Sequence, residues 1–357
     1  MKHRLISYII AAFFAVSLFP SVALQAAPYA AVVMDARNGK IYHSRNADTR
    51  LHPASLTKMM TLYVAFQAIE KNEISLDSYV TVSRNAAAEP PSKLWLKRGQ
   101  KIKLRYLIRA AAIKSANDAA TAIGEAISGT EAAFAKRMTR TARAMGMSRT
   151  TFKNAHGLTR SGHLSTARDM SILGRHMIYD YPQYYNLFSR RSADAKVRKV
   201  NNTNRRFLAA YRGADGIKTG YTRAAGFNLV ASAERGGERI VATMFGGSST
   251  AARNKRVAQL LDMGFDRAPS TAKLQRPSLP PYNQNENEHG GKTLRLVTAV
   301  KRSLRPKMRP FGEASAAEDA VVAALPALQV QPDDILTAVP SATTCAVAVQ
   351  VSAAPYD

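Results

Sequence analysis

The residues most able to carry out chemistry begin with a serine and a lysine three positions apart. Ser55 and Lys58 open an apolar stretch with helical spacing, so both side chains lie on one face and the amine can reach the hydroxyl. Serine is a weak nucleophile at neutral pH, and an amine whose pKa is lowered by burial and neighbouring cations can act as its base. A similar pair, Ser270 and Lys273, lies in a proline-rich segment without an apolar helix. The context therefore favours Ser55.

Two further motifs could complete a site around this serine. Ser115 and Asn117 fall between helical stretches, where the hydroxyl can relay a proton and the amide can hold a substrate amide. Taken alone, this pair is more typical of a helix N-cap. Lys218, Thr219 and Gly220 precede a predicted hairpin and supply positive potential, a hydroxyl and room for a peptide backbone. Each motif is weak alone, but the order S-x-x-K, S-x-N, K-T-G in one chain is a strong combination.

The elements that must position these residues form an α+β pattern. Hairpins are predicted over 29–43, around an Asn-Gly turn, and over 226–245, around an Arg-Gly-Gly turn. We therefore expect an antiparallel sheet built from both chain ends, with a helical subdomain against it. Apolar residues recurring at spacings of three and four predict helices over 55–70, 104–113, 117–127, 131–145, 166–179 and 252–263.

The composition and the first residues restrict the class and the compartment. Of the 357 residues 46% are apolar and 21% charged, which excludes collagen, a coiled coil and wholesale disorder. The single cysteine, Cys345, excludes an internal disulfide and a zinc cluster of the cysteine type. A basic start, an apolar run over 5–19 and small residues at Ala26 and Ala27 predict a signal peptide over residues 1–26, cleaved near Ala26 or Ala27; a retained membrane anchor is the alternative. We expect a secreted, periplasmic or cell-envelope protein.

The positive charge is concentrated in the predicted domain. The net charge of the chain is +26, and residues 27–268 hold 40 basic and 17 acidic residues, a net charge of +23. For an exported protein this charge indicates anionic envelope polymers or lipids as partners and argues against nucleic acid. Residues 269–357 are predicted to be a low-complexity, mostly disordered tail. Within the tail, segment 292–309 indicates either weak peripheral membrane contact or a plain linker.

The three motifs and their surroundings resemble the penicillin-binding protein and serine β-lactamase superfamily, and within it the low-molecular-weight D-alanyl-D-alanine carboxypeptidases. The resemblance covers residues 29 to about 267 and includes the stretches 54–61, 154–158, 165–169 and 216–222. It implies a β-lactamase/transpeptidase-like fold, peptidoglycan stem peptides as substrate and β-lactam antibiotics as ligands. Neither a cofactor nor a metal is expected.

The resemblance also assigns roles to residues. It implies that Ser55 is the acylated nucleophile, that Lys58 is its base, and that Ser115 forms the second wall of the site and takes part in catalysis. The substrate-binding residues are expected to be Asn117, Lys218, Thr219, Gly220, Thr222 and Arg253.

Three of these expectations concern less specific positions. Arg253 matches an arginine that helps to bind the free carboxylate of the terminal D-alanine, a group that a guanidinium fork fits; a surface arginine is the alternative. The backbone amides of Ser55 and Thr222 are expected to form the oxyanion hole. For His156, which lacks a second metal-ligand partner in the sequence, a packing or turn role is expected.

The predicted reaction is removal of the terminal D-alanine of the peptidoglycan pentapeptide through an acyl-Ser55 intermediate. A D,D-endopeptidase that cuts peptidoglycan cross-links is the main alternative. A β-lactamase is disfavoured, because neither Glu125 nor Glu131 has an asparagine four residues later, as the deacylating loop of the commonest type requires. A non-catalytic envelope-binding protein would explain the charge but not the three motifs.

Overall fold

The computed structural model describes residues 27–282. The predicted signal peptide, the segment 292–309 and the rest of the predicted tail beyond Tyr282 lie outside the described residues. Within the described part of the chain, no helix is both long and apolar enough to cross a membrane.

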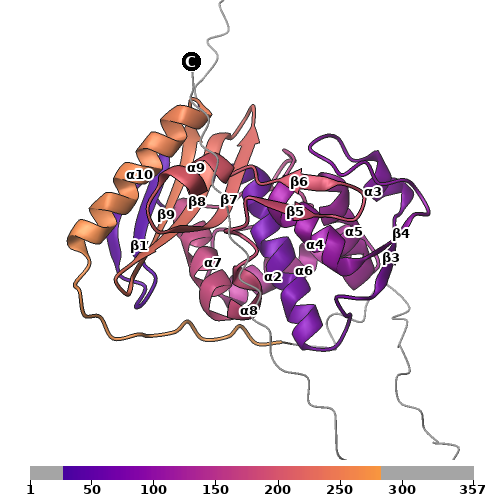
Figure 1. Ribbon diagram of the computed structural model, residues 1–357, viewed down its shortest axis with the longest axis horizontal. Helices are drawn as coiled ribbons and strands as arrows, with labels where there is room; N and C mark the ends of the chain where they lie inside the picture. Colours follow the sequence, from indigo (N-terminus) through magenta and orange to yellow (C-terminus); the bar gives the residue numbers. More distant parts are fainter. Residues whose placement is uncertain (1–26, 283–357) are drawn as a thin grey trace, which may run out of the picture. The chain divides into compact units, whose positions relative to one another are not determined.

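A five-stranded antiparallel sheet is built from both ends of the domain, as the sequence predicts (Figure 1). Its strand order is β2-β1-β9-β8-β7, so the first hairpin pairs with the last strand along the chain. The strand β7 therefore lies at an edge of the sheet. The strands are β1 (Ala30–Asp35), β2 (Ile41–Arg45), β7 (Ala214–Thr222), β8 (Gly226–Arg235) and β9 (Glu238–Gly247).

Helices cover both faces of this sheet (Figure 1). Alternate strand residues point to opposite faces, so Val33 and Ala231 pack with helix α10 (Thr250–Arg267), whereas Val32 and Val230 belong to the larger core that includes helix α7 (Ala167–Tyr179). The strand alternation thus separates two apolar cores, one on each side of the sheet. The α+β class predicted from the sequence is confirmed.

A helical subdomain contributes its buried residues to the same large core. A short 3₁₀ turn, η1 (Ala54–Leu56), leads into the buried helix α2 (Thr57–Glu70), which packs against α5, α6 and η2, while α4 packs against α5 and η2. The bounds of these elements are α4 (Leu104–Arg109), the π-helical turn η2 (Ala110–Lys114), α5 (Asn117–Ser128) and α6 (Glu131–Ala144). The helix predicted over 104–113 thus changes to π-type hydrogen bonding after Arg109, immediately before the Ser115 motif.

Several short elements were not predicted, because each is too short to show a periodic pattern. They are β3 (Tyr79–Thr81), α3 (Arg84–Ala88), β4 (Lys101–Lys103), α8 (Pro182–Tyr185), β5 (Ser192–Asp194), β6 (Lys199–Asn201) and α9 (Arg205–Ala210). In the chain, β3, α3 and β4 lie between α2 and α4, and the other four lie between α7 and β7.

The chain beyond α10 continues along the domain without a helix or strand as far as residue 282 (Figure 1). The Arg37 guanidinium donates to the carbonyl of Pro269 at 2.8 Å, and Gln275 N donates to the carbonyl of Arg37 at 2.8 Å. At its end the Tyr282 hydroxyl donates to Glu73 Oε1 at 2.7 Å. Residues 269–282 therefore contact the domain. A domain boundary at Ala268 stays a prediction.

Candidate active site

The predicted site residues meet around one cleft, with a volume of about 350 Å³, between the edge strand β7 and the helical subdomain. Two of the nine, Lys58 and Lys218, lie behind its wall and are 0% and 1% exposed. The other seven line it: Ser55, Ser115, Asn117, Thr219, Gly220, Thr222 and Arg253.

The serine and the lysine of the first motif lie side by side at the start of α2. Ser55 is in the 3₁₀ turn and Lys58 in the first turn of the helix, which brings Lys58 Nζ to 3.2 Å from Ser55 Oγ. The Nζ group also donates to Asn117 Oδ1 at 2.7 Å and to the carbonyl of His156 at 2.6 Å. A neutral amine has two hydrogens and one lone pair. With both hydrogens donated to these acceptors, the lone pair is left for the Ser55 hydroxyl.

The electrostatics of the cleft favour that neutral amine. Burial, and then the nearby charge of Lys218, hold the pKa of Lys58 well below its usual value. Burial, followed by the charge of Arg253, lowers the pKa of Lys218 to about 7. Lys58 is therefore suited to act as a general base at neutral pH.

Ser115 faces the second lysine in a strained backbone conformation. Its φ of 63° and ψ of 35° are left-handed, which is uncommon for a residue other than glycine. This conformation ends η2 and directs the hydroxyl to Lys218, whose Nζ donates to Ser115 Oγ at 2.8 Å. Helix α5 begins at Asn117 without a side-chain cap. The N-cap interpretation of this motif is therefore wrong, and the strain is of the kind that persists where a side chain must be aimed.

The third motif lies on β7, where its glycine is packed against the backbone of the turn that carries Ser55. A Cβ at Gly220 would lie 3.0 Å from Pro53 O and 3.2 Å from Ser55 N. The sequence suggested that this glycine makes room for a substrate backbone, whereas in the structure it lets the strand pass against the Ser55 turn. The Thr219 hydroxyl is held 2.7 Å from Thr203 Oγ1 at the cleft wall.

A second glycine, Gly157, touches the same turn and was not among the predicted site residues. Its φ is +91°, and a Cβ there would lie 1.9 Å from the carbonyl oxygen of Ala54. Ala54 itself has a φ of +49°. The two glycines thus enclose the turn that carries Ser55. In the sequence, this glycine could have been found only through the stretch 154–158, which resembles the corresponding stretch of the carboxypeptidase family.

Arg253 is 4% exposed, and it lines the cleft from the first turn of α10. Its guanidinium donates to Asn254 Oδ1 at 3.1 and 2.8 Å, and within residues 27–282 it forms no ion pair with a carboxylate. Burial lowers its pKa to about 10. A buried cation without an anionic partner, in the same cleft as Ser55, suits the carboxylate of a bound ligand.

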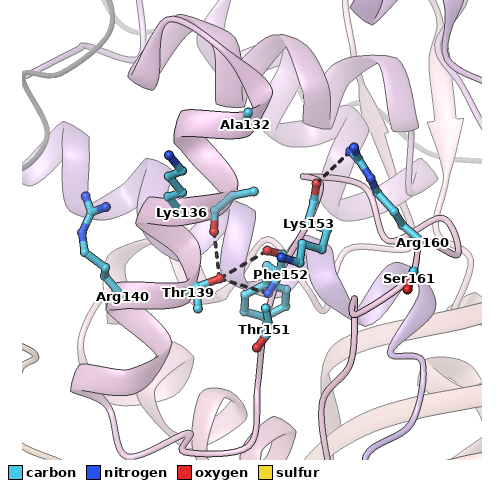
Figure 2. A pocket seen from close by; sticks show the side chains of 10 residues that line it. Ala132, Lys136, Thr139, Arg140, Thr151, Phe152, Lys153, Arg160 and Ser161 are labelled. Carbon is cyan, nitrogen blue, oxygen red and sulfur yellow. Dashed lines mark hydrogen bonds between the residues drawn. The ribbon is translucent and has the colours of Figure 1, made fainter.

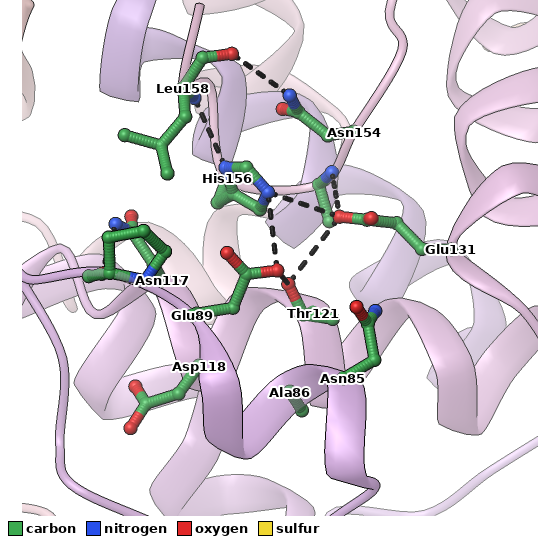
Figure 3. A network of polar contacts seen from close by, with 12 residues as sticks. Asn85, Ala86, Glu89, Asn117, Asp118, Thr121, Glu131, Asn154, His156 and Leu158 are labelled. Carbon is green, nitrogen blue, oxygen red and sulfur yellow. Dashed lines mark hydrogen bonds and ion pairs between the residues drawn. The ribbon is translucent and has the colours of Figure 1, made fainter.

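His156 belongs to a buried polar network beside the cleft (Figure 3). Its Nδ1 accepts from Leu158 N at 3.1 Å, so the proton of the neutral ring is on Nε2, which lies 3.3 Å from Glu131 Oε1 and 3.4 Å from Glu89 Oε1. That tautomer points a hydrogen, not a lone pair, at the carboxylates, and the arrangement therefore does not suit a metal ion. The backbone carbonyl of His156 accepts from Lys58, and the amide of the same peptide, Gly157 N, donates to Asn154 Oδ1 at 2.7 Å.

Another hollow, on the outer side of α6, has a larger volume of about 660 Å³ (Figure 2). Its lining includes the cations Lys136, Arg140, Lys153 and Arg160 and the hydroxyl of Ser161. It holds none of the residues of the three motifs. Its chemistry gives no basis for assigning catalysis to it.

Comparison with known proteins agrees with this geometry. A family model described as D-alanyl-D-alanine carboxypeptidase, peptidase S11, matches residues 19–249. The carboxypeptidase DacF of Bacillus subtilis is 36% identical over 261 residues, which are 72% of this chain and 64% of the relative. The carboxypeptidase DacC of Escherichia coli is 36% identical over 240 residues, 66% of this chain and 60% of the relative. The chain thus spans less than two thirds of these relatives.

Solved structures of penicillin-binding proteins are similar to this chain in fold and in sequence. Penicillin-binding protein 5 from Haemophilus influenzae has a TM-score of 0.64 and 34% identity, over 68% of this chain and 72% of that one. Penicillin-binding protein D2 from Listeria monocytogenes, in an ampicillin-bound form, has a TM-score of 0.61 and 33% identity, over 69% of this chain and 99% of that one. A cefotaxime-bound form of the same protein matches equally well. The chain belongs to the peptidase S11 family of D-alanyl-D-alanine carboxypeptidases.

Proposed function

We propose that this protein is a serine-type D-Ala-D-Ala carboxypeptidase that removes the terminal D-alanine of peptidoglycan pentapeptides. The observation that carries the proposal is the contact of Lys58 Nζ with Ser55 Oγ at 3.2 Å, in a cleft that also contains the buried guanidinium of Arg253. The first supplies an activated nucleophile, and the second supplies a partner for the free carboxylate that a carboxypeptidase substrate must have.

In the proposed acylation step, the neutral amine of Lys58 takes the proton of the Ser55 hydroxyl. Ser55 Oγ forms a bond to the carbonyl carbon of the penultimate D-alanine. The tetrahedral intermediate then collapses, the C–N bond breaks, and the departing D-alanine amine takes a proton from the protonated Lys58. Ser115 and Lys218, joined by a hydrogen bond of 2.8 Å, lie next to this path and can relay that proton.

The oxyanion of the intermediate needs two hydrogen-bond donors. The amide of Ser55 is one. For the other, Thr222 is the residue expected from the sequence, and Tyr221 lines the same part of the cleft. Because Gly220 contacts Ser55 N, the amide that follows it in the chain, that of Tyr221, is the nearer candidate along the strand. We therefore place the second donor at Tyr221 or Thr222 of the edge strand.

Hydrolysis of the acyl-enzyme repeats the acylation with water as the nucleophile. Lys58 takes a proton from the water, the hydroxyl attacks the acyl carbon, and Ser55 Oγ leaves with the proton. The products are a shortened peptide with a new carboxylate and free Ser55. β-Lactams would acylate the same serine, and the ampicillin-bound and cefotaxime-bound forms of the Listeria relative support this part of the proposal.

The test is the release of D-alanine from a purified pentapeptide, compared with cleavage of a cross-linked peptide dimer. We expect the full-length protein to release D-alanine from the pentapeptide, and Ser55→Ala to abolish the release. Cleavage of the dimer without release from the pentapeptide would instead identify a D,D-endopeptidase. Rapid hydrolysis of benzylpenicillin would contradict both.

The surroundings of the enzyme are part of the same proposal. We propose a secreted, periplasmic or envelope location, after removal of a signal peptide near Ala26 or Ala27, and weak peripheral membrane contact through residues 292–309. The basic composition of the chain supports a position among anionic envelope polymers. Sequencing the N-terminus of the secreted protein tests the cleavage. Co-sedimentation of the protein truncated before 292 with anionic vesicles tests the membrane contact.

A further inference from the structure

A second groove, with a volume of about 470 Å³, adjoins the cleft. Thr203 and Thr250 line both. Lys93 of the groove directly follows Ser92 of the cleft, and Lys114 of the groove directly precedes Ser115 of the cleft. A ligand bound at Ser55 and longer than the cleft can therefore continue into this groove.

The lining of the groove is strongly basic. It contains six cations and no acidic residue, and within residues 27–282 none of the six forms an ion pair. One of them, Lys93, donates to the backbone carbonyls of Ala87 and Glu89 at 2.8 and 2.7 Å, which holds it in place. Unpaired cations gathered in a concave surface focus a positive potential on an anionic ligand. The six are Lys93, Lys114, Arg198, Lys199, Arg205 and Arg206.

The same groove carries an exposed aromatic side chain. Trp95, the one tryptophan of the chain, is 58% exposed, and its φ of +69° is a strained, left-handed conformation for such a bulky residue. The buried carboxylate of Asp118 accepts from Leu94 N at 2.9 and 3.0 Å and from Leu96 N at 3.1 Å. The amides on either side of Trp95 are thus fixed.

This arrangement indicates a binding role for the indole. A large apolar side chain held exposed in a strained conformation costs stability, and such strain is found mainly at functional positions. Lys93 Nζ lies 5.1 Å from the indole ring, which adds a cation beside it. A flat aromatic surface among cations suits a polymer that combines sugar rings with carboxylates.

We propose that this groove is an extended subsite for polymeric peptidoglycan, in which the cations bind carboxylates of the stem peptides and Trp95 packs against the glycan. The inference rests on the proposed function, because it assigns the groove to the rest of the substrate whose terminal D-Ala-D-Ala enters the cleft. It identifies the preferred substrate as the assembled polymer rather than a free peptide.

The experiment compares two substrates for the same full-length enzyme: isolated peptidoglycan sacculi and a soluble tripeptide that ends in D-Ala-D-Ala. The test variants are Arg205→Ser with Arg206→Ser, and Trp95→Ala. Charge-matched controls carry Lys136→Ser with Arg143→Ser on α6, where both side chains are exposed and outside the groove. Equal melting temperatures verify that each variant is folded.

We expect the ratio of sacculus activity to tripeptide activity to fall roughly tenfold in the double arginine variant at low salt, since two exposed charge pairs are lost. The difference in this ratio between the variant and the wild type should be smaller at high salt, because salt already screens the attraction of the wild-type groove for carboxylates. Arg205→Lys with Arg206→Lys should restore most of the ratio. Trp95→Ala should lower the ratio at every salt concentration, and the α6 control should retain it.

An unchanged ratio in both test variants would overturn the inference, and so would an equal fall in the α6 control. Loss of binding to anionic phospholipid vesicles or to single-stranded DNA, with the sacculus ratio retained, would assign the groove to another polyanion and also overturn it. Failure of the proposed function looks different: the wild type then releases no D-alanine from either substrate. In that case, co-sedimentation of Ser55→Ala with sacculi, with and without the groove substitutions, still tests whether the groove binds peptidoglycan.

Discussion

Substituting Gly157 by alanine should damage the active site without touching any residue that reacts. The φ of +91° is unfavourable for alanine, and the new Cβ would lie 1.9 Å from Ala54 O, 2.5 Å from Ala54 C and 2.8 Å from Thr57 Oγ1. Two of these three atoms are backbone atoms of the turn that carries Ser55. Either this turn or the 154–158 loop must therefore move.

The expected magnitude has two parts. The backbone conformation alone costs about 1–2 kcal/mol for a residue with a Cβ. The contact with Ala54 and Thr57 adds about 1–3 kcal/mol, as is typical of overpacking. Because His156 O holds Lys58 Nζ at 2.6 Å, movement of the loop also displaces the base. A displacement of about 1 Å costs about 100-fold in rate, so acylation should slow on that order.

Gly146 offers a matched control. Its φ is +86°, close to that of Gly157, but a Cβ there would meet no atom within 4 Å. Gly146→Ala should therefore lose only the conformational part of the stability and retain the wild-type rate of acylation by a fluorescent penicillin. Urea unfolding and acylation kinetics on both variants separate the two effects. If Gly157→Ala matches Gly146→Ala in both measurements, the steric reasoning is refuted.

Four further outcomes are expected. Ser55→Ala should abolish labelling by fluorescent penicillin, and label retained on the variant would disprove the assigned nucleophile. Arg253→Ala should slow the hydrolysis of a peptide that ends in a D-alanine carboxylate more than the hydrolysis of the same peptide ending in a D-alanine amide. Equal losses for both peptides would show that Arg253 has only a structural role. Arg253→Gln should raise the pKa of Lys218, now about 7, and move the nearby limb of the acylation pH profile upward, whereas an unmoved limb excludes this coupling. Mass spectrometry should detect a benzylpenicillin adduct that persists for minutes.

The sheet and the three motifs could be predicted because their signals are local. Each hairpin is marked by a glycine-containing turn between apolar runs. The reach of Lys58 to Ser55 follows from helical spacing, and the observed distance of 3.2 Å agrees with it. The pairing of β1 with β9 could be predicted from the single assumption that the two hairpins belong to one sheet.

The remaining parts of the site depend on contacts between distant segments, which leave no periodic signal. Gly157 is needed because of an atom of Ala54, about a hundred positions earlier in the chain. The exposed conformation of Trp95 is fixed by the buried carboxylate of Asp118, which accepts from Leu94 N. From the sequence alone, Asp118 would be interpreted only as an acidic residue in the first turn of a helix. The sequence contains these residues, but only the assembled fold defines their partners.

An anionic ligand in the cleft would change the protonation of its two lysines in different ways. Lys58, Lys218 and Arg253 all have pKa values below their usual ones, for which burial is the main cause. A substrate carboxylate beside Arg253 offsets the positive charge that now lowers the pKa of Lys218, and therefore favours a proton there. The charge of a protonated Lys218 in turn lowers the pKa of Lys58, for which it is the largest cause after burial. The same ligand would thus favour a proton on Lys218 and leave Lys58 neutral, as the proposed base requires.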